Sequence, residues 1–190
     1  MTGSHLGMPR EPHLDRIYTV GHSNHALDRF LRILQCHRVA RVVDIRSFPR
    51  SRRHPQFDAE PLRDALQRVG LAYEGLTPLG GMRRPRPDSR NLAFPPDGLR
   101  GYADHMETRE FADAVDVLLV LARQAPTAVL CAEADWRRCH RSLLCDALSV
   151  RGVEALHVVG EGHPEAHEMT SHARVEGRRL WYPGEQRRLF

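Results

Sequence analysis

The sequence predicts a single α/β domain of three layers, in which a mainly parallel sheet is covered by helices on both faces. Three observations predict this class. Strand-like apolar runs alternate with helical patterns, most connections between them are short, and residues 39–45 are almost continuously apolar, as in a strand buried on both faces. With 190 residues, of which 41 % are hydrophobic, the chain is long enough to bury a substantial core.

Five runs have the character of strands. The first ends at Gly21, which permits a tight turn, and the third follows Gly70, which suits the left-handed end of a helix. The predicted strands cover residues 16–20, 39–45, 71–76, 127–132 and 155–159.

Four helices are predicted between these strands. The first is capped by Asn24 or a neighbour, and its apolar residues recur at i, i+3, i+4 and i+7 from Leu27 to Leu34. Thr108 caps the clearest helix, whose apolar face starts at Phe111. The helices cover residues 24–37, 61–69, 108–122 and 139–150, and a shorter helical piece covers 102–106. The Pro-, Gly- and Arg-rich residues 78–98 form a long loop that we expect to be functional or disordered.

The ends of the chain and its cysteines indicate a cytoplasmic protein. We predict a disordered leader over residues 1–14, which lack the apolar segment of a signal peptide, and one domain over residues 15–190. No apolar run approaches 18 residues, so we expect no membrane span. Reduced thiols are then expected, and Cys36 and Cys145, each within a helical pattern, should be buried structural thiols. The sequence indicates no oligomeric state.

All 28 basic residues are arginines. The absence of lysine excludes a Schiff-base lysine, a pyridoxal-phosphate enzyme and a lysine-containing P-loop, because each needs a lysine amine. The net charge of +4 and the isoelectric point near 9.2 favour an anionic partner.

Polar residues follow the first two predicted strands, where open α/β sheets bind ligands. The amides after Gly21, including that of Ser23, suit an anion, and His22 is a candidate general base, metal ligand or hydrogen-bonded turn residue. Asp44 and Arg46 lie two residues apart, so we expect one partly buried ion pair at the carboxyl edge of the sheet.

Two loops add candidate binding groups. Arg50, Arg52 and Arg53 follow the second strand, and guanidinium groups bind phosphate or carboxylate in a bidentate manner. In the later loop, Gly80 and Gly81 let the backbone approach a ligand. Tyr102 is a candidate to stack on a ring or to donate a hydrogen bond.

The stretch from Cys131 to Ser142 concentrates the most chemistry, with two thiols, an imidazole, carboxylates and guanidinium groups between a strand and a helix. Cys131 and Arg137 have the spacing of the phosphate loop of cysteine phosphatases, but acidic residues such as Glu133 lie between them and no glycine bends the loop. Cys139 is a competing nucleophile, because it lies near the predicted start of a helix.

The same stretch also offers metal-binding residues. Cys131, Cys139 and His140, with His22 as a fourth ligand, form a plausible soft-donor set, although the chain has no short Cys-x2-Cys pair. The later histidines are loosely spaced, which is typical of solvated turns; they are His157, His163, His167 and His172.

Together these segments resemble the DUF488 family of bacteria and archaea. The matching stretches occur in order from residue 16 to about 183: 19–23, 43–52, 79–81, 100–104, 131–133 and 139–142. Family members often carry a Pro-Trp pair where this chain has Asp135-Trp136. The resemblance implies a compact α/β domain and supports the same site map. It implies no reaction, because the family is named for unknown function.

We therefore expect an enzyme, either a hydrolase or a transferase, that acts on a small anionic or nucleotide-like substrate. Cys131 or Cys139 would be the nucleophile with His22 or His140 as acid/base, or else Glu133 would be the principal acid/base and the thiols structural. The expected catalytic residues are Cys131, Glu133, Cys139, His140 and His22, and the expected substrate-binding residues are Ser23, Asp44, Arg46, Arg52, Gly80, Gly81, Tyr102 and Arg141.

Two other classes stay open. The chain has the arginine-rich loops 50–53 and 83–90 of a nucleic-acid-binding accessory protein, and the Cys/His set of a metal-binding protein. We assign no metal ligand among the expected site residues, and the sequence identifies no cofactor.

Overall fold

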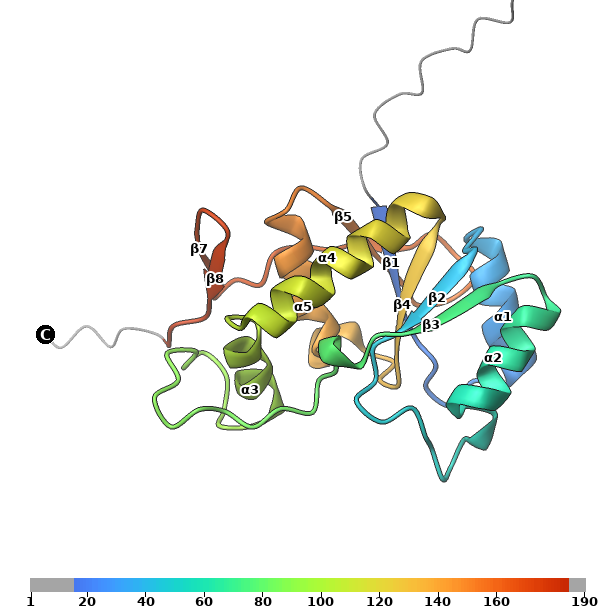
Figure 1. The fold of residues 1–190 in the computed structure, drawn as a ribbon, viewed down its shortest axis with the longest axis horizontal. Coiled ribbons are helices and arrows are strands. Elements are labelled where there is room, and N and C mark those ends of the chain that lie inside the picture. Colours follow the sequence, from blue (N-terminus) through green and yellow to red (C-terminus); the bar gives the residue numbers. More distant parts are fainter. Residues whose placement is uncertain (1–15, 185–190) are drawn as a thin grey trace, which may run out of the picture.

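A computed structural model describes residues 16–184, so the predicted leader over 1–14 lies outside the described residues. The strands of the central sheet (Figure 1) have the order β3-β2-β4-β1-β5-β6, as their pairing shows. Five strands run parallel, and β6 pairs antiparallel with β5. The strands are β1 (Arg16–Gly21), β2 (Arg41–Asp44), β3 (Ala72–Gly75), β4 (Thr127–Cys131), β5 (Glu154–Val158) and β6 (Glu165–Ala166), and a separate hairpin joins β7 (Arg174–Glu176) and β8 (Arg179–Trp181).

Helices cover both faces of this sheet, which confirms the predicted α/β class with a mainly parallel sheet. In Figure 1, α1 and α2 lie together on one side, whereas α3, α4 and α5 lie on the other. The helices are α1 (Leu27–Cys36), α2 (Ala59–Arg68), α3 (Gly98–His105), α4 (Arg109–Gln124) and α5 (Arg141–Ser149). Among the described residues, no helix has both the length and the apolar character needed to cross a membrane.

The alternation of side chains along each strand divides the core into two halves. In β2, Val42 packs with Phe30 of α1 and Leu62 of α2, whereas its neighbour Val43 packs with Phe111 of α4 on the opposite face. Both neighbours are fully buried, so this strand is covered on both faces, as the nearly continuous apolar run over residues 39–45 predicted.

The parallel strands end at a common edge. Gly21, the last residue of β1, is in register with Cys131, the last residue of β4, and Asp44 of β2 is in register with Leu130. The residues that follow each of these strands therefore meet at one edge, and this edge carries the candidate site.

Several local predictions differ from the structure. The predicted helical piece at 102–106 is α3, which starts four residues earlier because the Asp97 side chain accepts a hydrogen bond from the Leu99 amide. Helix α1 begins after Ala26, with no side-chain cap from Asn24. The prediction that Cys36 is buried is wrong, because this thiol is exposed at the end of α1, but Cys145 is fully buried as predicted.

The long loop after residue 79 packs onto the protein. Ser89 Oγ and Asn91 Nδ2 donate hydrogen bonds to the carboxylate of Asp104 in α3, at 2.6 and 2.8 Å. Asn91 also accepts a hydrogen bond from the Tyr182 amide, which ties the C-terminal part of the described chain to this loop.

Candidate functional site

A pocket of about 810 Å³ opens at the carboxyl edge of the sheet. It is formed by the segments that follow β1, β2 and β4, by the start of the loop after β3, and by the segment that leads into α3. The residues singled out by the sequence that line it are His22, Arg46, Arg50, Gly81, Cys131, Glu133, Arg137, Cys139 and His140.

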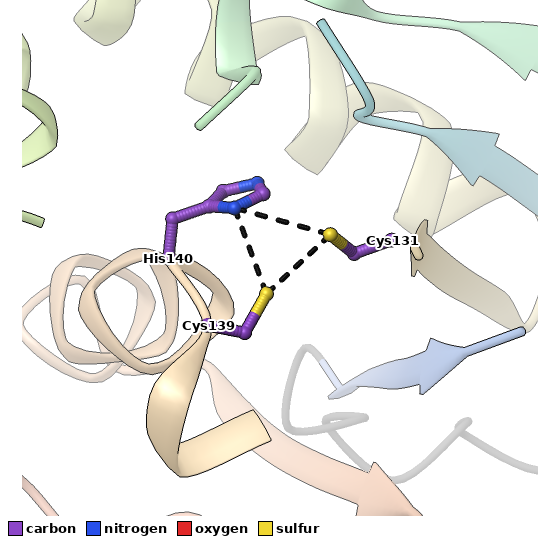
Figure 2. A group of neighbouring side chains, drawn as sticks. All are labelled: Cys131, Cys139 and His140. Carbon is purple, nitrogen blue, oxygen red and sulfur yellow. Dashed lines mark hydrogen bonds between the residues drawn. The ribbon is translucent and has the colours of Figure 1, made fainter. Parts of the chain in front are cut away.

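Three buried side chains form a triangle in the wall of this pocket (Figure 2). The Cys131 and Cys139 sulfurs are 3.4 Å apart, and His140 Nδ1 lies 3.9 and 3.6 Å from them. Cys131 ends β4, whereas Cys139 and His140 immediately precede α5, so the triangle joins a strand end to a helix start. We call these three residues the thiol–imidazole cluster.

The two thiols of the cluster differ in acidity. The hydrogen bond between them lowers the pKa of Cys139 below its ordinary value, and His140 and Arg141 add to this effect. The same hydrogen bond, together with burial, raises the pKa of Cys131. The pair therefore favours one thiolate on Cys139 next to a protonated Cys131.

The imidazole of His140 is held by close packing. A Cβ atom at Gly81 would overlap the His140 ring around Nδ1, so only glycine fits there. The ring centroid of Tyr102 lies 4.9 Å from that of His140 on another side. His140 Nε2 is buried without a hydrogen-bond partner among the described residues.

Arg46 is part of a hydrogen-bonded chain next to this cluster. Its guanidinium forms a bidentate ion pair with Asp44, with Nη2 to Oδ2 at 2.5 Å and Nε to Oδ1 at 2.8 Å. The pair is almost completely buried, more so than the sequence suggested. The hydroxyl of Tyr73 donates to Asp44 at 2.7 Å, so the carboxylate is fully engaged.

His22 lies at the other end of this chain, and both of its ring nitrogens are in use. Nδ1 donates to the Ser23 carbonyl at 2.9 Å, and Nε2 accepts from Arg46 Nη1 at 3.3 Å. Burial lowers the pKa of His22 to about 4, so the ring is neutral at neutral pH. Its ring stacks on Phe57, with centroids 4.4 Å apart. These contacts occupy both ring nitrogens of His22 and hold its ring beside Arg46.

Arg141 is buried behind the pocket wall, with 1 % of its surface exposed. Its guanidinium donates to the carbonyls of Glu133 and Ala134, and its Nε lies 3.4 Å from the Cys139 sulfur. A Cβ atom at Gly21 would overlap the Glu133 carbonyl, so the loop after β4 is in close contact with Gly21 on one side and with Arg141 on the other.

The loop from Cys131 to Arg137 differs from a phosphate loop. Its Asp135 and Arg137 amides donate to the carboxylates of Glu133 and Asp135, at 3.3 and 3.0 Å. Arg137 forms an ion pair with Glu165 at 2.8 Å. Amides that are already bound to carboxylates are not free to bind an anion, so this geometry does not favour the phosphatase interpretation.

The remaining predicted site residues lie around the pocket without lining it. Asp44 and Arg141 support its wall, Tyr102 is fully buried with its hydroxyl donating to the Leu79 carbonyl, and Gly80 packs against Ser47. Ser23 is half-buried with its amide bound to the Ala132 carbonyl, and Arg52 is exposed in the loop after β2.

Several lining residues were not singled out by the sequence analysis. Of the large apolar side chains in residues 16–184, Phe48 and Met82 are the most exposed, at 70 % and 73 %, and both lie at the pocket. Arg138 also lines it. Their only sequence signal is their position in loops that follow strands or flank the paired glycines.

A second group of cysteine and histidine side chains lies deeper in the protein. The sulfur or nitrogen atoms of Cys145, His157 and His167 lie within 4.8 Å of one another. His157 is only 1 % exposed, and the Trp136 ring stacks on it with centroids 3.7 Å apart. The prediction that these histidines belong to solvated turns is therefore wrong for His157 and for the buried side chain of His167.

The histidines of this second group form a continuous chain of hydrogen bonds. His157 Nδ1 lies 2.7 Å from Thr19 Oγ1 and its Nε2 lies 3.0 Å from His167 Nδ1, while His167 Nε2 lies 2.8 Å from Asp146 Oδ1. Asp146 also accepts from the Tyr182 hydroxyl at 2.8 Å. We call Thr19, His157, His167, Asp146 and Tyr182 the buried relay.

Comparison with known proteins identifies the family. The model of the domain of unknown function DUF488 matches residues 26–148, which is more than half of the chain, so this protein belongs to the DUF488 family. The match includes the complete thiol–imidazole cluster, Arg46 and Glu133, whereas His22 precedes it. No curated protein and no solved structure matches the chain significantly.

Proposed function

We propose that this protein is an enzyme that acts on a small anionic substrate bound in the pocket, with the thiol–imidazole cluster and Glu133 as its reactive groups. One observation carries the proposal: a single pocket brings this cluster and an exposed carboxylate together with arginines that have no acidic partner among the described residues. A cavity with a few convergent polar groups and thiols of shifted pKa is typical of an enzyme site.

Two arginines in the pocket wall are available to a substrate. Arg50 and Arg138 are exposed and form no ion pair with another described residue, whereas Arg46 and Arg137 are paired with Asp44 and Glu165. Free guanidinium groups favour a phosphate or carboxylate group on the substrate.

The apolar side chains at the pocket suggest that the substrate also has an apolar or planar part, away from its anionic group. Phe48 and Met82 expose about 70 % of their surface beside the arginines. Apolar side chains exposed at a pocket often mark a binding surface, and an aromatic ring can stack on a planar group. A nucleotide combines a planar base with an anionic group and would satisfy both features.

Glu133 is the candidate acid/base. It is exposed and lines the pocket beside the cluster, so it can exchange protons with a bound substrate or water. Of the described groups, its Oε1 accepts a hydrogen bond only from the Asp135 amide, at 3.3 Å, which leaves the carboxylate free to act.

The loop from Arg83 to Arg90 supports this proposal over a nucleic-acid-binding role. Arg83 donates to the carbonyls of Gly80 and Pro78, and Arg86 and Arg90 form ion pairs with Glu107. Arginines that are held by the protein itself contribute less to binding a phosphate backbone.

Calorimetric titration with adenosine monophosphate and with inorganic phosphate tests the proposal. We expect saturable binding that Arg138→Ala and Arg50→Ala each weaken by about 10-fold, while the exposed Arg84→Ala does not change it. A chain that binds neither anion, or that binds a single-stranded oligonucleotide equally well in all three variants, would contradict the proposal.

Hydrolysis of p-nitrophenyl phosphate and p-nitrophenyl acetate tests the role of Glu133. We expect Glu133→Gln to reduce any turnover by about 100-fold or more, because a positioned general acid or base contributes this much. Glu74→Gln, in the exposed part of β3, is the matched control. Full turnover in the Glu133→Gln variant would remove Glu133 from the mechanism.

A further inference from the structure

The three donor atoms of the thiol–imidazole cluster have the separations of ligands around one metal ion. The sulfurs are 3.4 Å apart, and His140 Nδ1 lies 3.6 and 3.9 Å from them. Tetrahedral zinc, with Zn–S and Zn–N bonds of about 2.3 and 2.0 Å, holds two sulfurs about 3.8 Å apart and a sulfur and a nitrogen about 3.6 Å apart. Each observed separation agrees with these values to within about 0.4 Å.

The donor atoms also face one another, as Figure 2 shows. The hydrogen bonds of His140 Nδ1 to described residues remain within the triangle. Each sulfur has one further contact: the Glu133 backbone amide donates to Cys131 Sγ, and Arg141 Nε lies 3.4 Å from Cys139 Sγ. The lone pairs of all three atoms can therefore point to a common centre, as metal ligation requires.

The second group of cysteine and histidine side chains, whose histidines belong to the buried relay, differs because its donor atoms cannot all point to a common centre. Cys145, His157 and His167 also lie within 4.8 Å of one another, but the histidine nitrogens are already bound to Thr19, to each other and to Asp146. A metal ion there would have to replace these hydrogen bonds, so the same residue types do not form an equivalent site.

A disulfide does not account for the geometry. The two sulfurs are 3.4 Å apart, compared with about 2.05 Å in a disulfide, and both cysteines are free. A disulfide would also leave the lone pair of His140 Nδ1 without a partner, whereas a metal ion binds all three donor atoms.

The fourth coordination position faces the pocket. All three ligands line the pocket, so one side of the triangle is open to it. His22, the fourth ligand that the sequence suggested, is not available, because its nitrogens are bound to the Ser23 carbonyl and to Arg46. Catalytic zinc sites have three protein ligands and one open position for water or substrate.

We infer that Cys131, Cys139 and His140 bind one zinc-class divalent cation whose fourth position opens into the substrate pocket. The two thiolates offset the charge of the ion. With the ion bound, the cysteines act as ligands in place of nucleophiles, and the cluster would take part in the reaction through the open coordination position. The role of the open coordination position rests on the proposed function, because a water molecule or the substrate bound at this position would lie next to Glu133.

Metal binding is tested on the full chain, purified without an affinity tag and loaded with Zn²⁺ or with Co²⁺. We expect about one tightly held Zn²⁺ per chain, and with Co²⁺ the thiolate-to-metal charge-transfer band together with the strong visible bands of tetrahedral cobalt. Cys131→Ser, Cys139→Ser and His140→Ala should each weaken metal binding by more than about 100-fold. Cys36→Ser, which removes the exposed thiol, should bind as the wild type does.

If a ligand variant fails to fold, the cobalt spectrum of the wild-type chain still tests whether thiolates bind the metal. A spectrum without the thiolate band, or metal content that is unchanged in the folded Cys131→Ser and Cys139→Ser variants, would overturn the inference. So would loss of the metal in a folded Cys145→Ala variant, because the ion would then lie at the second group.

Binding of adenosine monophosphate to the same preparations separates the two proposals. If the chain binds the nucleotide but holds no Zn²⁺, the metal site is wrong and the proposed function stands. If it holds Zn²⁺ on the predicted ligands but binds neither nucleotide nor phosphate, the metal site stands and the proposed function is wrong.

Discussion

The two groups of cysteine and histidine side chains in this protein use similar residues in different ways. In the thiol–imidazole cluster, the donor atoms interact mainly with one another and line an open pocket. In the buried relay, every histidine nitrogen has a partner, and Asp146 accepts hydrogen bonds from His167 and from the Tyr182 hydroxyl.

This difference shows that residue type alone does not indicate a reactive site. A histidine whose two nitrogens are both hydrogen-bonded contributes to stability, whereas one that faces two thiols at a pocket is available for chemistry. We therefore expect changes in the relay mainly to lower stability and leave ligand binding intact, and changes in the cluster mainly to abolish ligand binding.

The largest effect on stability should come from Asp146→Ala. This change removes the buried carboxylate that accepts hydrogen bonds from three donors, His167 Nε2, the Thr170 amide and the Tyr182 hydroxyl. Because each unsatisfied buried group costs about 1–3 kcal/mol, we expect the free energy of unfolding to fall by about 3 kcal/mol or more. Urea unfolding measures it, with the exposed Asp113→Ala as control. Equal stability of the two variants would mean that the relay is not structural.

Gly81→Ala should disrupt the cluster instead. The added Cβ would overlap His140 near Nδ1, so the imidazole must move away from the thiols. We expect loss of metal and nucleotide binding, with a cost of about 1–3 kcal/mol for overpacking. Gly75→Ala is the matched control, since a Cβ there meets no atom within 4 Å. A Gly81→Ala chain that binds like the wild type would show that His140 need not be fixed.

The relay should also make stability depend on pH. Burial lowers the pKa of His157 to about 3, so below the unfolded pKa of about 6.5 the unfolded chain binds a proton that the folded chain does not. The contribution of His157 to the free energy of unfolding is therefore fully present above about pH 6.5 and is lost as the pH falls. At pH 5 the loss is about 2 kcal/mol.

Urea unfolding at pH 7 and at pH 5 measures this dependence. His157→Gln should reduce the difference in stability between the two pH values, whatever its effect on stability at pH 7. His163→Gln, at an exposed position, should leave the difference unchanged. An unchanged pH dependence in His157→Gln would mean that another group titrates in this range; His22, whose pKa burial also lowers, would be the first to consider.

The smallest effect should come from Cys145→Ala. Cys145 is fully buried but makes no hydrogen bond within residues 16–184, so its loss leaves only a small cavity. We expect a cost of roughly 1 kcal/mol and unchanged metal and nucleotide binding. Thermal unfolding and metal analysis check both parts, and a loss greater than that of Asp146→Ala would make the thiol, and not the carboxylate, the centre of the relay.

The pocket residues that the sequence identified correctly follow from one rule of sheet geometry. Cys131 lies at the end of one predicted strand, and Arg46 and His22 lie just after two others, and parallel strands end at the same edge. Their meeting at one pocket could thus be predicted without knowledge of the packing. The cluster itself could be named as a set of residue types, but the separations that favour a metal ion appear only in three dimensions.

Other features depend on packing that the sequence does not encode locally. Arg141 has the sequence environment of a ligand-binding arginine, yet it is 1 % exposed because two carbonyls of the loop after β4 satisfy its guanidinium. Cys36 lies in an amphipathic helix that ends at this residue, where the thiol reaches solvent. The relay joins residues from β1, β5 and α5 with partners beyond β6, and no local pattern links these segments.

The pairing between β1 and β4 continues beyond the sheet. The His22 amide donates to the Cys131 carbonyl and the Ser23 amide to the Ala132 carbonyl, each at 3.0 Å. The backbone that carries the first thiol is therefore fixed before any ligand arrives, and capture of a ligand requires little loss of conformational entropy. In deuterium-exchange measurements these two amides should accordingly exchange as slowly as those of a central strand, although they lie in a connecting segment.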